Sequence, residues 1–199
     1  MYTAAGGRLN SNIKRLIMSL GDLPEPSAST VLIVVSGLPG TGKSYFSARL
    51  VEKLDSIILE SDAIRKRLFS SPVYSTEEST SLFRVIHQLI EYLLKKGVSV
   101  ILDATNLSES HREHLYNIAE KSHARLVLVE VTAPPELVFS RLERRSGEEG
   151  NKSDADWSIY QQMAPTAEKI HRHHYSVDTS HDITPAIDKI IREIKRTDR

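Results

Sequence analysis

The sequence predicts an α/β fold, in which a five-stranded parallel sheet carries helices on both faces. Three observations lead to this prediction. Short apolar runs alternate with segments of helical periodicity, the run 31–35 is apolar without interruption, and a glycine-rich turn joins that run to a helix. An unbroken apolar strand is typical of a parallel sheet that is covered on both sides. In such a sheet, ligands bind at the carboxyl ends of the strands.

The composition indicates one globular domain with a small extension. The chain has 199 residues, of which 40% are hydrophobic, and its 26 basic and 26 acidic residues balance. This balance gives no general attraction to nucleic acid or to a membrane surface. The chain contains no cysteine, which excludes disulfides and thiolate metal sites and is common in a reducing compartment. Residues 13–20 are too short and too charged for a membrane span or signal core. We therefore expect a cytoplasmic protein without a membrane anchor.

Residues 1–29 are expected to form an extension and a linker before a domain that spans residues 30–199. Residues 12–20 carry an apolar stripe at helical spacing. The stripe packs on the domain or binds a partner, and packing is the preferred interpretation because an apolar stripe usually meets a core. Pro24 and Pro26, among small polar residues, indicate the linker.

Five short apolar runs predict the strands of the sheet. Each run is separated from the next by a segment of helical periodicity, as βαβ connections require. The runs are 31–35, 56–59, 98–102, 125–131 and 175–178.

Apolar residues at three- and four-residue spacing predict the helices between these strands. The clearest helix follows the capping sequence Ser75 to Glu78 and ends at Lys95, Lys96 and Gly97, where cations and a glycine suit a helix end. Pro134 suits the first turn of a later helix. The expected helices are 44–54, 63–69, the helix from the capping sequence 75–78 to 95–97 with apolar residues over 82–94, 108–122, 134–145, 154–163 and one from 184 onward.

Residues 146–153 are glycine-rich, charged and without apolar periodicity, which predicts a flap. Together with the helices beside it, this flap predicts a small helical lid over about residues 141–165.

A phosphate-binding loop is the most specific motif in the chain. The pattern G-x-x-x-x-G-K-[ST] is fitted by Gly37, Leu38, Pro39, Gly40, Thr41, Gly42, Lys43 and Ser44, and Tyr45 follows directly. Glycines let backbone N–H groups surround an anion, and the helix N-terminus adds positive potential. Lys43 can reach the outer phosphates of a nucleotide, and Ser44 can bind Mg²⁺. The alternative, a glycine turn that only joins a strand to a helix, fits this context poorly.

Asp62 is the candidate general base. It follows the second predicted strand, so it lies at the edge of the sheet where the phosphate-binding loop also lies. The alternative is that Asp62 or Ser61 only caps the next helix. Arg65 comes one turn later and can bind a phosphate or other anion of the substrate, or it is a solvated surface residue.

Asp103 ends the third predicted strand, where a carboxylate can help to hold Mg²⁺. The alternative is a turn-forming aspartate. Asn106 and Arg112 lie just beyond and are weaker candidates for the lining of the same cleft.

Arg141 and Arg145 are spaced i, i+4 at the end of a helix that leads into the flap. Both can therefore point towards the phosphates of a nucleotide. The alternative is that basic residues in the last turn compensate the helix dipole.

In this ordered set of motifs the chain resembles the P-loop kinases related to polynucleotide 5′-hydroxyl kinases and zeta toxins, often described as AAA-type ATP-binding proteins. The resemblance covers about residues 31–182. It rests on Gly37 to Ser44, Ser61 to Arg65, Val100 to Asn106 with Arg112, Arg141 to Arg145 and Ser153 to Trp157. It implies a three-layer α/β/α sandwich with strand order 2-3-1-4-5.

The resemblance also implies roles for individual residues. Asp62 is then the base for an acceptor hydroxyl and Arg65 a substrate-phosphate contact, while Asp103 supports either Arg65 or the metal. Arg141 and Arg145 become lid arginines over the phosphates, catalytic together with Lys43. Thr179 and Ser180 would lie near the adenine.

The sequence thus predicts an ATP- and Mg²⁺-dependent transfer of the γ-phosphoryl group to a hydroxyl, on a nucleic acid 5′ end, a nucleotide or a small molecule. The alternatives are a zeta-toxin-like nucleotide-sugar kinase and an ATP-binding switch without kinase activity. The sequence gives no indication of oligomeric state.

Overall fold

A computed structural model describes residues 11–146 and 155–196 and contains a parallel five-stranded sheet in the order β2-β3-β1-β4-β5. The predicted fold class and strand order are therefore confirmed. The strands are β1 (Val31–Ser36), β2 (Ser56–Glu60), β3 (Ser99–Asp103), β4 (Arg125–Thr132) and β5 (Tyr175–Asp178).

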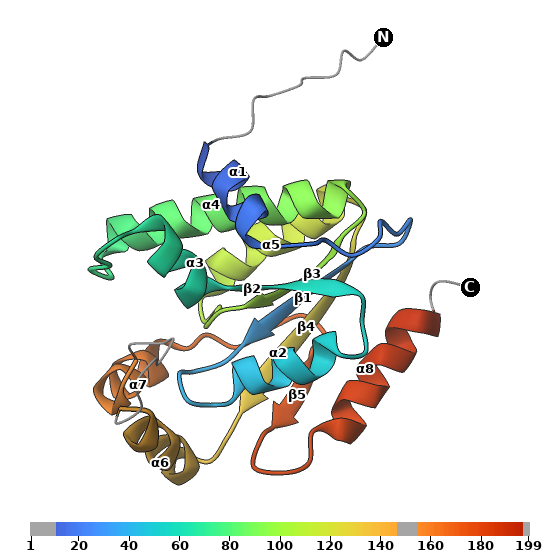
Figure 1. Ribbon diagram of the computed structural model, residues 1–199. Helices are drawn as coiled ribbons and strands as arrows, with labels where there is room; N and C mark the ends of the chain where they lie inside the picture. Colours follow the sequence, from blue (N-terminus) through green and yellow to red (C-terminus); the bar gives the residue numbers. More distant parts are fainter. Residues whose placement is uncertain (1–10, 147–154, 197–199) are drawn as a thin grey trace.

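The helices form two layers around this sheet. In Figure 1, α1, α3, α4 and α5 cover one face, α2 and α8 cover the other, and α6 and α7 lie beyond the carboxyl ends of the strands. The helices are α1 (Ser11–Ser19), α2 (Lys43–Val51), α3 (Ser61–Leu68), α4 (Thr76–Lys95), α5 (Glu109–Lys121), α6 (Pro135–Ser146), α7 (Trp157–Met163) and α8 (Thr184–Arg196), with a 3₁₀ turn η1 (Ala164–Thr166) after α7.

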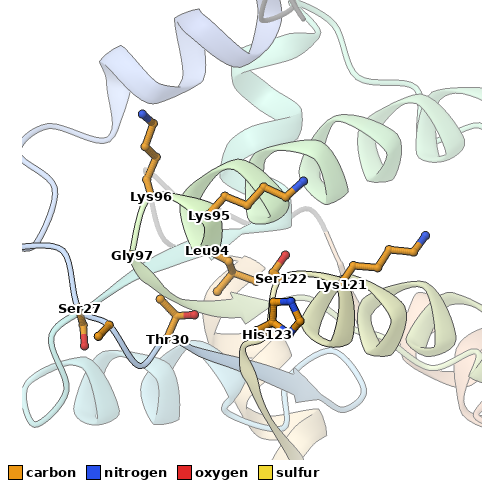
Figure 2. A pocket seen from close by; sticks show the side chains of 10 residues that line it. Ser27, Thr30, Leu94, Lys95, Lys96, Gly97, Lys121, Ser122 and His123 are labelled. Carbon is orange, nitrogen blue, oxygen red and sulfur yellow. The ribbon is translucent and has the colours of Figure 1, made fainter. Parts of the chain in front are cut away.

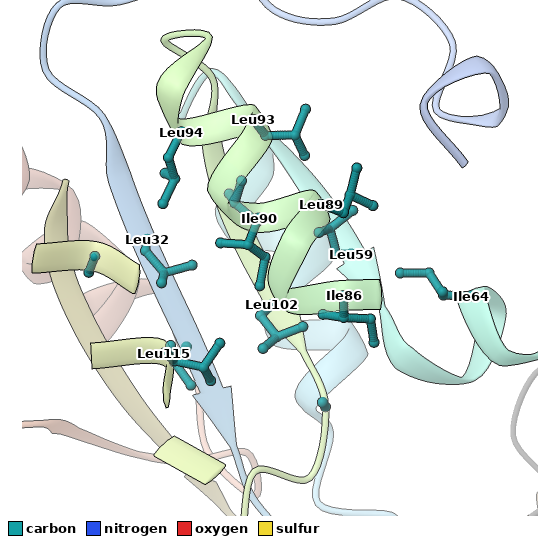
Figure 3. Close-up of a cluster of buried hydrophobic side chains, with 14 of the residues drawn as sticks. Leu32, Leu59, Ile64, Ile86, Leu89, Ile90, Leu93, Leu94, Leu102 and Leu115 are labelled. Carbon is teal, nitrogen blue, oxygen red and sulfur yellow. The ribbon is translucent and has the colours of Figure 1, made fainter. Parts of the chain in front are cut away.

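The central strand β1 is buried along its whole length, as its apolar sequence predicted. Its side chains alternate between two cores: Leu32 and Val34 face α4 and α5, whereas Ile33 and Val35 face α2 and α8. Figure 3 shows the first core, in which Leu32 lies with leucines and isoleucines of α4. Burial of one such side chain contributes about 1.5–3 kcal/mol, so these two cores hold the strand ends in place.

Helix α4 begins and ends as its sequence predicted. The Ser75 hydroxyl accepts a hydrogen bond from the Glu78 amide, and Gly97 follows the helix with a φ of 80°. The Glu78 carboxylate differs from a regular capping box, because it accepts from the Val73 and Tyr74 amides at 2.8 and 3.3 Å.

Helix α1 packs on the first core through Ile13 and Leu16, which are 5% and 1% exposed. Its apolar stripe therefore packs on the domain, which was the preferred of the two interpretations of the sequence. The described part of the chain contains no helix long and apolar enough to cross a membrane.

Helix α7 begins at Trp157 rather than at residue 154, because Asp156 is its N-cap and accepts a hydrogen bond from the Ile159 amide at 3.0 Å. Most of the predicted flap, residues 147–153, lies outside the described residues, as does Asp154.

Candidate active site

The phosphate-binding loop connects β1 to α2, and Gly40 and Gly42 take backbone conformations there that favour glycine. Gly42 is the N-cap of α2 with a φ of 95°, and Gly40 has a φ of 78°. A Cβ atom on Gly40 would lie 2.8 Å from Val138 of α6. The loop is therefore tightly bent, as a loop that presents backbone N–H groups to an anion must be. It also lies in close contact with α6.

Lys43 is half-buried in the first turn of α2, and its ammonium donates to the Leu38 carbonyl at 2.9 Å. Burial lowers the pKa of Lys43, the carboxylates of Asp103 and Asp62 oppose this shift, and Arg145 adds to it. Four of the predicted catalytic or metal-binding residues thus lie within electrostatic reach of one another.

Asp103 lies at the carboxyl end of β3, beside β1, and is 5% exposed. Burial raises the pKa of its carboxyl group, while Lys43 and a hydrogen bond from Ser44 partly offset the shift. Its Oδ2 atom is buried and has no hydrogen-bond partner. A buried carboxylate oxygen without a partner, close to a serine hydroxyl, fits a Mg²⁺ ion well.

Asp62 is half-buried in the first turn of α3, and its carboxylate influences both Lys43 and Asp103. The capping alternative for Asp62 and Ser61 is wrong, because the N-cap of α3 is Glu60 and no side chain caps it. The structure therefore leaves the Asp62 carboxylate without a capping role.

Arg65 is buried, which excludes the alternative of a solvated surface residue. Its guanidinium forms an ion pair with Glu78, donates to the Ser79 hydroxyl at 3.2 Å and lies 4.6 Å from the centre of the Tyr74 ring. Its Nε atom is buried without a hydrogen-bond partner. Glu78 was predicted only as a helix-capping residue, and the sequence gives no sign that it pairs with Arg65.

Arg141 connects α6 to the phosphate-binding loop and to the end of β5. Its Nη1 atom donates to the Thr179 hydroxyl at 2.8 Å and to the Gly40 carbonyl at 3.4 Å, and Nη2 donates to the Thr179 carbonyl at 3.0 Å. The Thr179 hydroxyl donates to the Thr41 carbonyl at 2.6 Å. Thr179 therefore links the end of β5 to α6 and to the phosphate-binding loop, and it is also a candidate neighbour of the adenine.

Three further candidates differ in exposure. Arg145 is half-buried on the last turn of α6, within electrostatic reach of Lys43. Ser180 is exposed beyond β5, where its amide donates to the Asp178 carboxylate at 2.8 Å. Tyr45 is 57% exposed on the first turn of α2.

Asn106 and Arg112, the weaker substrate candidates, have other contacts. The Asn106 amide donates to the Val35 carbonyl at 2.8 Å and thereby joins the ends of β1 and β3. Arg112 is 1% exposed, and its guanidinium donates to backbone carbonyls and to Glu109. The prediction that Arg112 contacts substrate is therefore not supported, because protein acceptors already occupy this buried group.

The open depression in Figure 2 lies at the opposite end of the sheet from these residues, where α4 and α5 end. Lys95, Lys96, Lys121 and His123 contribute to its lining. Cations at helix C-termini offset the helix dipole, and Lys95 also pairs with Glu91. These basic residues are thus explained by the helix ends, and the candidate site remains at the carboxyl ends of the strands.

Comparisons with known proteins identify the family and the fold of this chain. The family model described as an AAA domain matches residues 32–170. An L-seryl-tRNA(Sec) kinase of Methanococcus maripaludis is 35% identical over 116 residues, which cover 56% of this chain and 44% of that kinase. An uncharacterized protein of Mycobacterium tuberculosis is 27% identical over 164 residues, or 76% of this chain and 32% of that protein. The chain thus spans less than half the length of these curated relatives.

Among solved structures, Kti12 of Chaetomium thermophilum in complex with ADP-AlF3 has a TM-score of 0.67 at 19% identity. The likeness covers 83% of this chain and 97% of that one. At this level of identity it shows a shared fold.

Proposed function

We propose that this chain is an ATP- and Mg²⁺-dependent kinase that transfers a γ-phosphoryl group to a hydroxyl. The premise is its family: the chain belongs to the AAA domain family, whose model matches residues 32–170. One observation carries this proposal. Lys43, which follows the phosphate-binding loop's glycines, lies within electrostatic reach of two carboxylates, Asp62 and Asp103, and of Arg145. Phosphoryl transfer needs this combination of a phosphate cradle, an acceptor-side carboxylate and cations around the migrating group.

In the proposed reaction, Asp62 takes the proton of the acceptor hydroxyl as its oxygen forms a bond to the γ-phosphorus. The bond between the γ-phosphorus and the bridging oxygen breaks, and ADP leaves with that oxygen. Lys43 and Arg145 stabilise the negative charge on the phosphoryl oxygens, and Arg141 holds α6 against the loop through Gly40. Arg65 lies one turn beyond Asp62 and is the candidate contact for an anionic group of the acceptor.

Ser44 and Asp103 are the residues that would hold Mg²⁺, because the Oδ2 atom of Asp103 is buried without a partner. When bound, the ion neutralises part of the charge of the nucleotide phosphates. Thr179 and Ser180 remain the proposed neighbours of the adenine.

The acceptor class is the open part of the proposal. A polynucleotide-kinase-like activity would use a 5′-hydroxyl end, and a zeta-toxin-like activity would use a nucleotide sugar. The archaeal relative is named for an acceptor serine attached to tRNA, and the chain covers 44% of that kinase. Seryl-tRNA therefore joins the acceptors to be tested.

The decisive experiment incubates the purified protein with Mg²⁺, γ-labelled ATP and a panel of acceptors. The panel contains 5′-hydroxyl oligonucleotides, nucleosides, nucleotide sugars, simple sugars and L-seryl-tRNA. We expect label on one class, and we expect Asp62→Asn to lower its rate by about 10²–10⁴-fold with ADP affinity retained.

Two results would count against the proposal. Full activity of Asp62→Asn would remove Asp62 as the base. Tight ADP binding without transfer to any acceptor or to water would favour the switch module instead.

A further inference from the structure

Arg112 joins its own helix α5 and the turn before it to residues 168–169, which are distant in the sequence. Its Nη1 atom donates to the Asn106 carbonyl at 2.7 Å, and Nη2 donates to the Glu168 and Lys169 carbonyls at 3.0 and 2.9 Å. Its Nε atom donates to Glu109 at 2.9 Å, so the buried positive charge is paired within α5. The fork of the guanidinium thus joins the turn after β3 to the segment that follows η1.

Glu168 strengthens the same junction from the other side. Its amide donates to the Leu107 carbonyl at 3.0 Å, and its carboxylate accepts from the Glu109 amide at 2.5 Å. Residues 168–169 are therefore fixed against the start of α5 by side-chain and backbone hydrogen bonds.

The fixed segment is close in sequence to α7. It begins two residues after η1, which itself follows α7 directly. Trp157 of α7 packs edge-on against Phe139 of α6, with ring centres 5.2 Å apart, and stacks on Tyr160 at 4.7 Å. The position of residues 168–169 therefore restricts where α7 can lie, and α7 in turn supports α6.

Helix α6 carries two arginines that interact with the phosphate-binding loop. Arg141 contacts the Gly40 carbonyl and Thr179, and Arg145 lies within electrostatic reach of Lys43. A displacement of about 1 Å in such groups can cost roughly 10²-fold in rate, even when its origin is distant from the chemistry.

We propose that Arg112 is a positioning residue that orients Arg141 and Arg145 by anchoring residues 168–169 and, through them, the packing of α7 on α6. The proposal rests on the proposed kinase function for its effect on turnover. Its anchoring step concerns the protein alone and has a readout that needs no activity.

The test compares Arg112→Lys with Arg125→Lys. A lysine at 112 keeps a positive charge beside Glu109 but cannot also donate to the carbonyls of Asn106 and of residues 168–169, because it lacks the planar fork. Arg125 is the matched control, since its Nη1 atom also donates to two backbone carbonyls, those of Glu193 and Ile194, at 2.7 and 3.2 Å. Both carbonyls belong to α8, which lies on the opposite face of the sheet from α5.

Trp157 provides the first readout, because it is the single tryptophan of the chain. We expect acrylamide to quench its fluorescence more strongly in Arg112→Lys than in the wild type, with no such change in Arg125→Lys. The second readout is ATP hydrolysis with water as the acceptor. For Arg112→Lys we expect kcat to fall roughly 10- to 100-fold, and the affinity for ADP to change by less than about threefold because the loop itself is intact.

Unchanged quenching and turnover in Arg112→Lys would overturn the proposal. Equal losses in Arg112→Lys and Arg125→Lys would also overturn it, because Arg112 would then only stabilise the fold. If the wild type hydrolyses no ATP and phosphorylates no acceptor, the kinase function fails, and the quenching comparison still decides the anchoring step. Arg112→Met, which removes the charge, extends the series where it folds.

Discussion

Two buried charges at the same edge of the sheet have opposite surroundings. The Asp103 carboxylate, at the end of β3, has one oxygen without a hydrogen-bond partner, and burial raises its pKa. The Arg112 guanidinium, on α5, donates to a carboxylate and to three backbone carbonyls. An unsatisfied buried charge is costly in the free protein and favourable only with a ligand, whereas a satisfied one belongs to the architecture. This difference supports the proposed role of Asp103 as a Mg²⁺ ligand and that of Arg112 as a framework residue.

The largest effect is expected for Arg112→Met, measured as the free energy of unfolding in urea. The change leaves the Asn106, Glu168 and Lys169 carbonyls without their donor and Glu109 without its cation. Breaking a buried charge network in this way costs about 3–5 kcal/mol. The exposed pair Arg49 and Glu52 is the control, since Arg49→Met should cost less than about 1 kcal/mol. A similar, small loss in both variants would contradict the view that the Arg112 junction is structural.

Lys43→Met should show the converse behaviour, with a loss of activity larger than its loss of stability. The variant removes the cation that we propose contacts the nucleotide phosphates, so ATP turnover should fall by about 10²–10³-fold or more. The free energy of unfolding should fall little or rise, because burial already disfavours the charged form and lowers the pKa of Lys43. Turnover at the wild-type rate would remove the phosphate-binding assignment of the loop.

The sequence was sufficient for the sheet, the phosphate-binding loop and the strand-end carboxylate Asp103, because apolar runs, glycines and strand ends are local signals. It did not distinguish Arg112 from Arg65, since both are arginines on helices near the site. Their surroundings come from residues distant in sequence: Glu78 for Arg65, and residues 168–169 for Arg112. A partner acquired by tertiary packing leaves no local pattern, so the sequence could not separate Arg65, the proposed substrate contact, from Arg112, a framework residue.

The Arg65–Glu78 pair is intermediate between Asp103 and Arg112. The Glu78 carboxylate accepts from the Val73 and Tyr74 amides and pairs with Arg65, whereas the Nε atom of Arg65 is buried without a hydrogen-bond partner. The Val73 amide and then Arg65 hold the pKa of Glu78 below its ordinary value of 4.5. Because the pKa of Glu78 is lower in the folded than in the unfolded protein, its ionised carboxylate stabilises the fold fully above about pH 4.5. This stabilisation is lost as the pH falls through the pKa of the folded state. Glu78→Gln should therefore unfold more easily than the wild type at pH 7, with a difference that shrinks in acid. Thermal unfolding between pH 7 and pH 3 measures this, and a constant difference would contradict the ion pair.

Asp103→Asn should change the free energy of unfolding by less than Arg112→Met does, and in the opposite direction. The substitution keeps the shape of the side chain but removes a charge that burial disfavours, so the nucleotide-free protein should gain about 1 kcal/mol in its free energy of unfolding. The same change removes a proposed Mg²⁺ ligand. Nucleotide binding by the variant should therefore respond less to added Mg²⁺ than binding by the wild type, measured by titration with ADP with and without the metal.

Asn106 is a suitable comparison: Asn106→Ser removes the amide that joins β1 to β3 and should lower stability while the response to Mg²⁺ persists. If Asp103→Asn instead destabilised the free protein and left the metal response intact, Asp103 would resemble Arg112, a framework charge, and the contrast between the two buried charges would fail.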